Sequence, residues 1–152
     1  MEIRIATLQD CCSIAEMAIG FRNQLERSLP TDCQFLESIS TLLSSRDTEF
    51  YIAILRDIPV GYVLQRYRYS MWANGVEATI EDLYVDPGAR RGGIGRGLIH
   101  FALLRATDQS CKSVCLDTNE NNVASTRIYT QLGFNAVSKR WNGRQVFFRL
   151  NL

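Results

Sequence analysis

A run of glycines between a predicted strand and a predicted helix constrains this chain more than any other feature. The run is Arg90-Arg91-Gly92-Gly93-Ile94-Gly95-Arg96-Gly97. Glycine adopts positive φ angles without steric cost and lets the backbone approach a ligand closely. The first amides of the following helix lack intrahelical partners, and the helix dipole favours an anion beside them. The run therefore predicts a cradle for a pyrophosphate group, with Arg90, Arg91 and Arg96 adding positive charge at its rim.

Three phosphate-binding patterns compete for this run. A Walker loop ends in Gly-Lys-Ser/Thr, which is absent here. A dinucleotide fingerprint needs Gly-x-Gly-x-x-Gly, but Leu98 stands where the third glycine should be. The third pattern, Arg/Gln-x-x-Gly-x-Gly/Ala, is met by residues 90–95. A tight strand-to-helix turn without a ligand is the remaining interpretation of so short a pattern.

Hydrophobic periodicity and capping residues place the glycine run in a mixed α/β fold. Helix caps are predicted at Thr7, at Thr31 (a capping box with Gln34) and, after the last helix, at Gly133. The predicted order is a strand at 3–5, a helix ending near residue 19, a helix after residue 31, strands at 50–55, 60–69 and 78–85, a helix from 94, a strand at 113–117, a helix at 122–132, and strands at 136–141 and 146–150. This order indicates a mixed sheet with helices on its faces.

The bulk composition excludes several classes of protein. The chain has 152 residues, which suits one domain over residues 1–152, and its net charge of +1 gives no general attraction to nucleic acid or an acidic membrane. No apolar run approaches the roughly 20 residues of a membrane span, and the first residues lack the blocks of a signal peptide. The five cysteines make a poor disulfide framework, and Cys111 and Cys115 have no second pair at zinc spacing. We therefore expect a cytoplasmic protein with no metal.

Two further blocks flank the glycine run. Upstream, Glu81-Asp82-Leu83-Tyr84-Val85-Asp86-Pro87 reads as a strand with a stop after it. Downstream, residues 122–134 follow Asn-x-x-Ala-x-x-Leu-Tyr-x-x-x-Gly-Phe, with Ser125 and Ile128 replacing the usual Ala and Leu. In this order and spacing, the blocks resemble the GNAT superfamily of N-acetyltransferases, whose central motif holds the pyrophosphate of acetyl-CoA. The first residues, from Ile3 to Asp10, also resemble the opening strand and helix cap of that family.

The resemblance implies a GNAT-like sheet, mostly antiparallel and of about seven strands, with helices on both faces. It implies acetyl-CoA as cosubstrate, with the pantetheine arm paired to the backbone of the fourth strand. The residues that it assigns to acetyl-CoA are Leu83, Tyr84, Val85, Arg90, Arg91, Gly92, Gly93, Ile94, Gly95, Arg96, Gly97, Asn122 and Ser125. Asn122 also suits a purely structural role as a helix N-cap.

The catalytic assignments follow from direct attack of an amine on the thioester. By resemblance, Tyr129 is the general acid, since a tyrosine hydroxyl is protonated at neutral pH and can donate to a thiolate. Core packing is the alternative role for Tyr129. We expect the base to be Glu81, because strand alternation puts Glu81 and Asp82 on opposite faces unless a bulge intervenes. Asp82 and a water chain are the alternatives.

The acceptor is expected to be an amine. Tyr69 and Trp72 are predicted near the mouth of its pocket, with Asp82 also contacting it, because aromatic faces and carboxylates suit a cation. This favours a small amine or a polyamine-like compound. The alternative acceptors are a protein lysine and a protein N-terminus. A module that binds acetyl-CoA without turnover is the alternative function. The chain could also form a homodimer.

Overall fold

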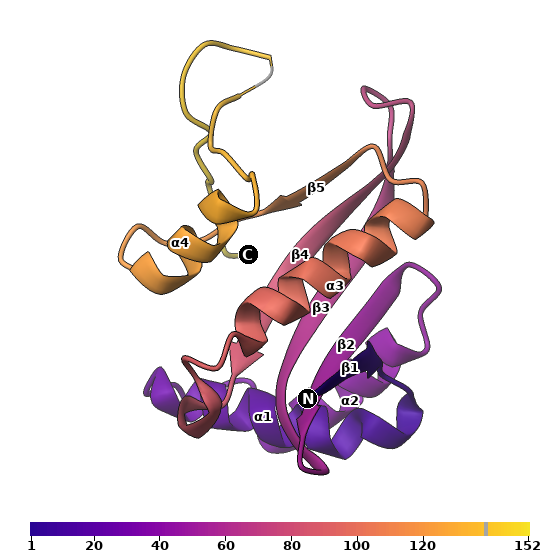
Figure 1. The fold of residues 1–152 in the computed structure, drawn as a ribbon, viewed down its shortest axis with the longest axis vertical. Coiled ribbons are helices and arrows are strands. Elements are labelled where there is room, and N and C mark those ends of the chain that lie inside the picture. Colours follow the sequence, from indigo (N-terminus) through magenta and orange to yellow (C-terminus); the bar gives the residue numbers. More distant parts are fainter. Residues whose placement is uncertain (139) are drawn as a thin grey trace. The chain divides into compact units, whose positions relative to one another are not determined.

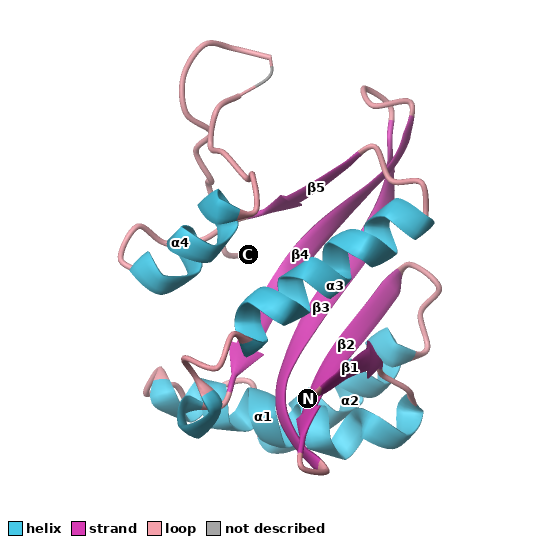
Figure 2. Cartoon of the chain, in the orientation of Figure 1, coloured by secondary structure: helices cyan, strands magenta, loops and turns pink. Residues whose placement is uncertain are grey.

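A five-stranded sheet organises residues 1–116, the first of two compact units in the chain. The computed structural model describes residues 1–138 and 140–152 (Figure 1). The strands are β1 (Glu2–Ile5), β2 (Thr48–Leu55), β3 (Ile58–Ser70), β4 (Gly75–Val85) and β5 (Ser113–Leu116). They lie side by side in sequence order; β1 to β4 are antiparallel, and β5 runs parallel to β4 (Figure 2).

Three helices accompany this sheet: α1 (Cys11–Gln24), α2 (Asp32–Leu43) and α3 (Ile94–Asp108). Two short 3-10 turns, η1 (Leu8–Asp10) and η2 (Pro87–Ala89), precede α1 and follow β4. The predicted capping box of α2 is confirmed, since the Thr31 amide donates to the Gln34 side chain and the Gln34 amide donates to the Thr31 hydroxyl. Helix α1 runs five residues beyond its predicted end near Ile19.

The two faces of the sheet are covered by different helices. One face packs Ile52, Tyr62 and Tyr84 against α1 and α2 in a single buried cluster. Helix α3 covers the other face, where the Phe101 ring meets Tyr51 edge-on at 5.3 Å. The β2–β3 hairpin turns at Arg56 and Asp57, as predicted, and both residues have the positive φ angles of a tight two-residue turn.

The second unit, residues 117–152, contains α4 (Val123–Gln131). Asn122 caps this helix, because its side-chain oxygen accepts a hydrogen bond from the Ser125 amide at 3.4 Å. Gly133 follows the helix with a φ of +93°, which confirms the left-handed position predicted there. Among the described residues, none of the helices combines the length and apolar character that a bilayer span requires.

The expected sheet of about seven strands is wrong: the sheet has five. The predicted strands at 136–141 and 146–150 are reduced, among the described residues, to one antiparallel bridge between Val137 and Arg144; residue 139 lies outside the described part. The bridge joins residues on either side of a segment longer than the predicted two-residue turn at Asn142-Gly143, and Gly143 within that segment has a φ of +123°. Val146, Phe147 and Phe148 remain exposed, and without a buried face this apolar run does not set a strand register.

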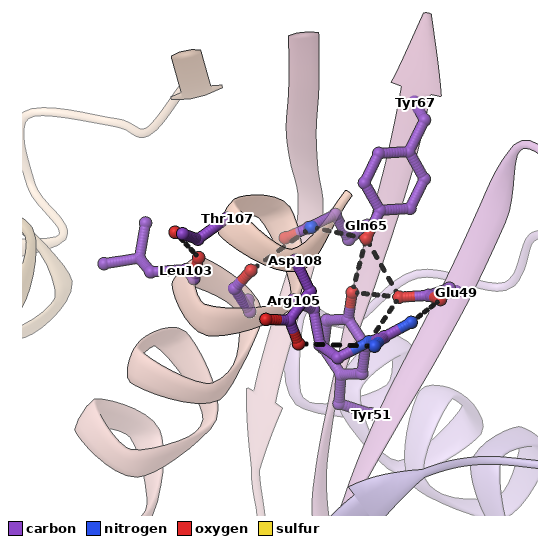
Figure 3. A network of polar contacts seen from close by, with 9 residues as sticks. Glu49, Tyr51, Gln65, Tyr67, Leu103, Arg105, Thr107 and Asp108 are labelled. Carbon is purple, nitrogen blue, oxygen red and sulfur yellow. Dashed lines mark hydrogen bonds and ion pairs between the residues drawn. The ribbon is translucent and has the colours of Figure 1, made fainter. Parts of the chain in front are cut away.

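Helix α3 is fastened to the sheet by a polar network around Glu49 (Figure 3). The Arg105 guanidinium donates to Glu49 Oε1 at 2.7 Å, and the hydroxyls of Tyr51 and Tyr67 donate to Glu49 Oε2 at 2.7 and 2.9 Å. Buried Gln65 donates to the Tyr67 hydroxyl and to the Ala102 carbonyl of α3. Burial alone would raise the pKa of Glu49, but these hydrogen bonds outweigh it and lower that pKa.

Replacing Arg105 should expose how much this network contributes. Arg105→Met leaves the Glu49 carboxylate half-buried without its cation, and we expect a loss of about 2 kcal/mol in the free energy of unfolding at pH 7. Because the pKa of Glu49 is lowered by folding, the loss should shrink as the pH falls below the ordinary glutamate value and the carboxyl protonates. Urea unfolding at pH 7 and pH 3.5 measures both effects.

The matched control is Arg46→Met, since Arg46 is exposed. It should change the free energy of unfolding by less than about 0.5 kcal/mol. Equal losses for the two variants, or a loss in Arg105→Met that does not depend on pH, would contradict this role for the network.

Candidate functional site

A bulge in β4 decides which of its carboxylates points into the protein. Leu64 of β3 pairs with Asp82, but the next residue, Gln65, pairs with Ile80, so Glu81 is an extra residue opposite no partner. A bulge of this kind reverses the alternation of faces along a strand. Asp82 consequently shares the α1 face with Tyr62 and Leu64, whereas Ile80 is buried on the α3 face.

Asp82 lies in the wall of a cavity of about 100 Å³ between α1, α2, the connection between them, and the sheet. The lining is mostly apolar and aromatic, with Phe21, Phe35 and Tyr62 as its rings. Its charged members are Asp82, Arg22 and Arg27. A small concave site with aromatic walls and few charged groups is the usual form of a small-molecule pocket.

The Asp82 carboxylate accepts hydrogen bonds from neutral groups, the Tyr62 hydroxyl and the Leu83 backbone amide. The Tyr62 hydroxyl, itself buried, donates to Asp82 Oδ2 at 2.5 Å. Burial raises the pKa of Asp82 above its ordinary value, and the hydrogen bond from Tyr62 only partly opposes that effect. A buried carboxyl with a raised pKa is better suited to accept a proton near neutral pH than an exposed one.

Glu81 lies elsewhere. Its side chain is exposed and forms a loose ion pair with Arg66, with 3.7 Å between the charged atoms. The expected orientations of the two carboxylates are therefore reversed, since Asp82 and not Glu81 reaches the cavity. No local signal in the sequence marks the position of this bulge, which depends on pairing with β3.

Tyr69 and Trp72 are not brought to this cavity. They lie at the far tip of the β3–β4 hairpin and are 68% and 74% exposed. Tyr69 pairs with Val76, which is six residues from Asp82 along β4, or roughly 20 Å at the rise of a strand. The hairpin is longer than predicted, because β3 reaches Ser70 and β4 begins at Gly75.

The outer edge of β4 beyond the bulge is unpaired with any strand of the described part of the chain. Strand β5 pairs with β4 only from Glu77 to Ile80, whereas β3 pairs with it as far as Val85. Among the described strands, none covers the other edge of residues 81–85. An extended amide chain such as pantetheine can add to an edge of this kind as an extra strand.

At this edge of β4, only the backbone of Tyr84 could contact a ligand. Its ring is buried, and its hydroxyl accepts a hydrogen bond from Gln24 of α1 at 3.3 Å. Arg90 bonds the same Gln24 and also donates to the Val85 carbonyl at 2.9 Å. Arg90 therefore ties the start of the glycine run to β4 and α1, a role that its place in the motif did not reveal.

The glycine run forms the predicted strand-to-helix turn. Gly93 is the N-cap of α3 with a φ of +78°, and a Cβ built on it would meet nothing within 4 Å. The first bond of the helix runs from the Gly97 amide to the Gly93 carbonyl at 2.9 Å, so the amides before Gly97 precede the intrahelical ladder. Open space at Gly93, before the amides that begin α3, fits the diphosphate of acetyl-CoA.

Two other residues of this turn are constrained by packing or by backbone conformation, namely Gly97 and Arg91. A Cβ on Gly97 would lie 3.0 Å from Ile3 Cδ1, so Gly97 packs closely against β1. Arg91 has a φ of +68°, a left-handed conformation that is costly for a residue with a side chain.

Tyr129 belongs to the second unit, where it lies on α4. Its side chain is buried, and its ring meets Phe134 edge-on with 5.9 Å between centroids. Asn122 and Ser125 lie in the first turn of the same helix, joined by the capping hydrogen bond described above.

The cavity also contains a group that sequence reasoning missed. Tyr62 stands in an apolar run, Val60 to Leu64, and reads there as ordinary strand packing. Its importance arises from pairing across the β3–β4 ladder and from the bulge, neither of which leaves a local signal.

Comparisons with known proteins show the family and the fold of the chain. Residues 14–134 match the model of the acetyltransferase (GNAT) family. An aminoglycoside N(6′)-acetyltransferase type 1 of Salmonella typhimurium is 24% identical over 134 residues, which cover 86% of this chain and 88% of that protein. The [ribosomal protein bS18]-alanine N-acetyltransferase of Escherichia coli K12 is 32% identical over 66 residues, 43% of this chain and 45% of that one.

A solved structure shares the fold. It is an aminoglycoside acetyltransferase from an uncultured soil metagenomic sample, in complex with sisomicin, with a TM-score of 0.79 and 19% identity. The match covers 99% of this chain and 95% of that one.

The environment of Asp82 predicts an unusual effect on stability. Because folding raises the pKa of Asp82, the folded protein loses stability as the pH rises from the ordinary aspartate value through the raised one. Asp82→Asn removes the ionisation and keeps an acceptor for Tyr62. We expect Asp82→Asn to melt at a higher temperature than the wild type at pH 7.5, with the difference narrowing at pH 4.

Thermal unfolding of Glu81→Gln is the control, because an exposed ion pair contributes about 0–1 kcal/mol. The opposite outcome is a melting temperature of Asp82→Asn that falls further below that of the wild type at pH 7.5 than at pH 4. It would mean that folding stabilises the charged form of the Asp82 carboxylate.

Proposed function

Since the chain belongs to the GNAT family of acetyltransferases, we propose that it transfers the acetyl group of acetyl-CoA to a small primary amine bound beside Asp82. The observation that carries the proposal is the Asp82 carboxylate, half-buried in the wall of a small aromatic cavity. Asp82 adjoins the stretch of β4 whose edge is open to an extended ligand. Donor and acceptor sites would thus meet along one strand.

The size of the cavity and the relatives support a small acceptor. At about 100 Å³, the cavity is smaller than the roughly 300–1,000 Å³ of pockets that enclose whole drug-sized molecules, so it would hold the reacting end of an amine. Relatives named as aminoglycoside N(6′)-acetyltransferases act on amines carried by small molecules, which makes aminoglycosides and polyamine-like compounds candidate acceptors. The bS18-alanine N-acetyltransferase keeps a protein N-terminus as the second candidate.

In the proposed reaction, Asp82 receives the acceptor as an ammonium ion and takes one proton from it, directly or through a water molecule. The freed nitrogen attacks the thioester carbonyl, the C–S bond breaks, and the products are an N-acetylated amine and the free thiol of coenzyme A. A backbone amide along β4 would stabilise the oxyanion of the tetrahedral intermediate. The amides that begin α3, together with the positive charges of Arg91 and Arg96, would hold the diphosphate.

We assign the base to Asp82 in place of Glu81. The two carboxylates are neighbours in sequence, but only Asp82 lines the cavity, and burial raises its pKa. Tyr62 holds the Asp82 carboxylate in one orientation through its hydrogen bond. Tyr62 therefore acts as a positioning residue.

Tyr129 is our proposed general acid for the departing thiolate. The support is its place in the 122–134 motif, which the family match includes, and the chemistry of its hydroxyl. Asn122 and Ser125 are proposed to contact the coenzyme, on the same motif.

Exchanging the two carboxylates tests the proposal. Asp82→Asn should lower kcat/KM for the best small amine by on the order of 10²-fold, and raising the pH should restore part of the activity because more amine is then free. Glu81→Gln is the matched control and should stay within about threefold of wild type. The measurement is the release of free thiol at pH 6.5 to 9.5 with a panel of amines.

The panel includes an aminoglycoside, a diamine, an amino acid and a peptide with a free N-terminus. Loss of activity in Glu81→Gln with normal activity in Asp82→Asn would return the base to Glu81. A protein that binds acetyl-CoA but releases no thiol with any amine would be a binding module, and the proposal would fall.

The general acid has its own test. Tyr129→Phe keeps the ring and its contact with Phe134 but deletes the proton donor. Turnover should fall on the order of 10²-fold, while the affinity for acetyl-CoA, measured by calorimetry, changes little. Tyr129→Phe turning over at the wild-type rate, with chemistry shown to be rate-limiting, would exclude the role.

A further inference from the structure

The charged side chains that line the cavity differ in whether they have a partner of opposite charge. Arg22 is already paired: its Nη1 donates to Asp32 Oδ1 at 2.8 Å and to the Pro30 carbonyl at 2.7 Å. Its side chain is 12% exposed, and the guanidinium lies 5.9 Å from the centre of the Phe35 ring. Arg22 therefore holds the connection between α1 and α2 against α1. Its positive charge is already paired with Asp32.

Two opposite charges remain in the lining. Asp82 is bonded by the neutral Tyr62 hydroxyl. The Arg27 guanidinium forms no hydrogen bond or ion pair with any residue in the described part of the chain. The two residues belong to different elements, Asp82 to β4 and Arg27 to the connection after α1, and no ion pair joins them. The cavity thus offers one anion and one cation.

We propose, on the basis of the function proposed above, that the acceptor is an amine that also carries a carboxylate, with its amine at Asp82 and its carboxylate at Arg27. A zwitterion of this kind pairs both charges at once. A polyamine or an aminoglycoside pairs only Asp82 and brings further positive charge toward Arg27, which costs binding energy. A guanidinium is the side chain whose planar fork best matches a carboxylate.

The different solvent exposure of Arg27 and Asp82 predicts how the acceptor is oriented in the cavity. Arg27 is exposed, whereas Asp82 and Tyr62 lie in the inner wall, so the carboxylate would remain near solvent while the amine enters. The rings of Phe21 and Phe35 line the space with apolar surface, which suits a short hydrocarbon link between the two ends. The residual charges and the apolar link together describe an amino acid or an ω-amino acid.

The test uses matched acceptors that differ only in the charge at one end. Straight-chain ω-amino acids of two to six carbons are compared with the alkylamines and the α,ω-diamines of the same length, by acetyl-CoA-dependent thiol release. At the best length, kcat/KM should be at least about tenfold higher for the amino acid than for the diamine, with the alkylamine between them. Arg27→Gln should bring the ratio of amino acid to diamine close to one.

Arg46→Gln is the control, because Arg46 is exposed and does not line the cavity; its ratio should equal that of the wild type. A diamine or an aminoglycoside acetylated better than every amino acid would overturn the inference and leave the proposed function standing. A preference for amino acids that persists in Arg27→Gln would also overturn the inference and leave the proposed function standing. No thiol release with any amine in either series would overturn both.

Discussion

The register of the β3–β4 ladder is the constraint on which the rest of this site depends. Ala78, Ile80 and Tyr84 all stand at even positions of β4, yet Ile80 is buried on the α3 face and Tyr84 belongs to the cluster under α1. A regular strand cannot bury these two residues on opposite faces. The extra residue, Glu81, resolves the conflict and in doing so turns Asp82 into the cavity. Burial of two apolar side chains thus positions the carboxylate that we assign to chemistry.

A second constraint is the attachment of α3 to the sheet. The glycine turn precedes the first residue of α3 and Arg105 lies in its last turn, so the Glu49 network fixes the end of α3 opposite to the glycine turn (Figure 3). At the other end, Arg90 links the turn to Val85 and Gln24. The amides that begin α3 therefore have a defined position relative to β4, which a coenzyme that contacts both elements would require.

Local signals in the sequence predicted much of this architecture. The Thr31 capping box, the Arg56-Asp57 turn and the left-handed Gly133 each depend on residues within one turn of each other, and each is confirmed. The glycine run also forms the predicted strand-to-helix turn, because Gly93 can adopt a positive φ without steric cost.

The remaining features depend on contacts between distant segments. The bulge at Glu81 depends on which face α3 covers, and it reversed the expected orientations of the two carboxylates. Tyr69 and Trp72 have suitable chemistry for an amine, but the length of the hairpin carries them away from Asp82. Val146, Phe147 and Phe148 are residue types that strands favour, yet a strand also needs a partner and a buried face, and neither is encoded within the segment.

A crystal structure with coenzyme A and a carboxylate-bearing amine tests the central claim most directly, because it locates both ligands on β4. We expect the amine nitrogen within hydrogen-bond distance, about 3 Å, of the Asp82 carboxylate. The diphosphate should lie on the amides that begin α3, beside Gly93. An amine bound at Glu81, or at the Tyr69 and Trp72 tip of the hairpin, would contradict the account.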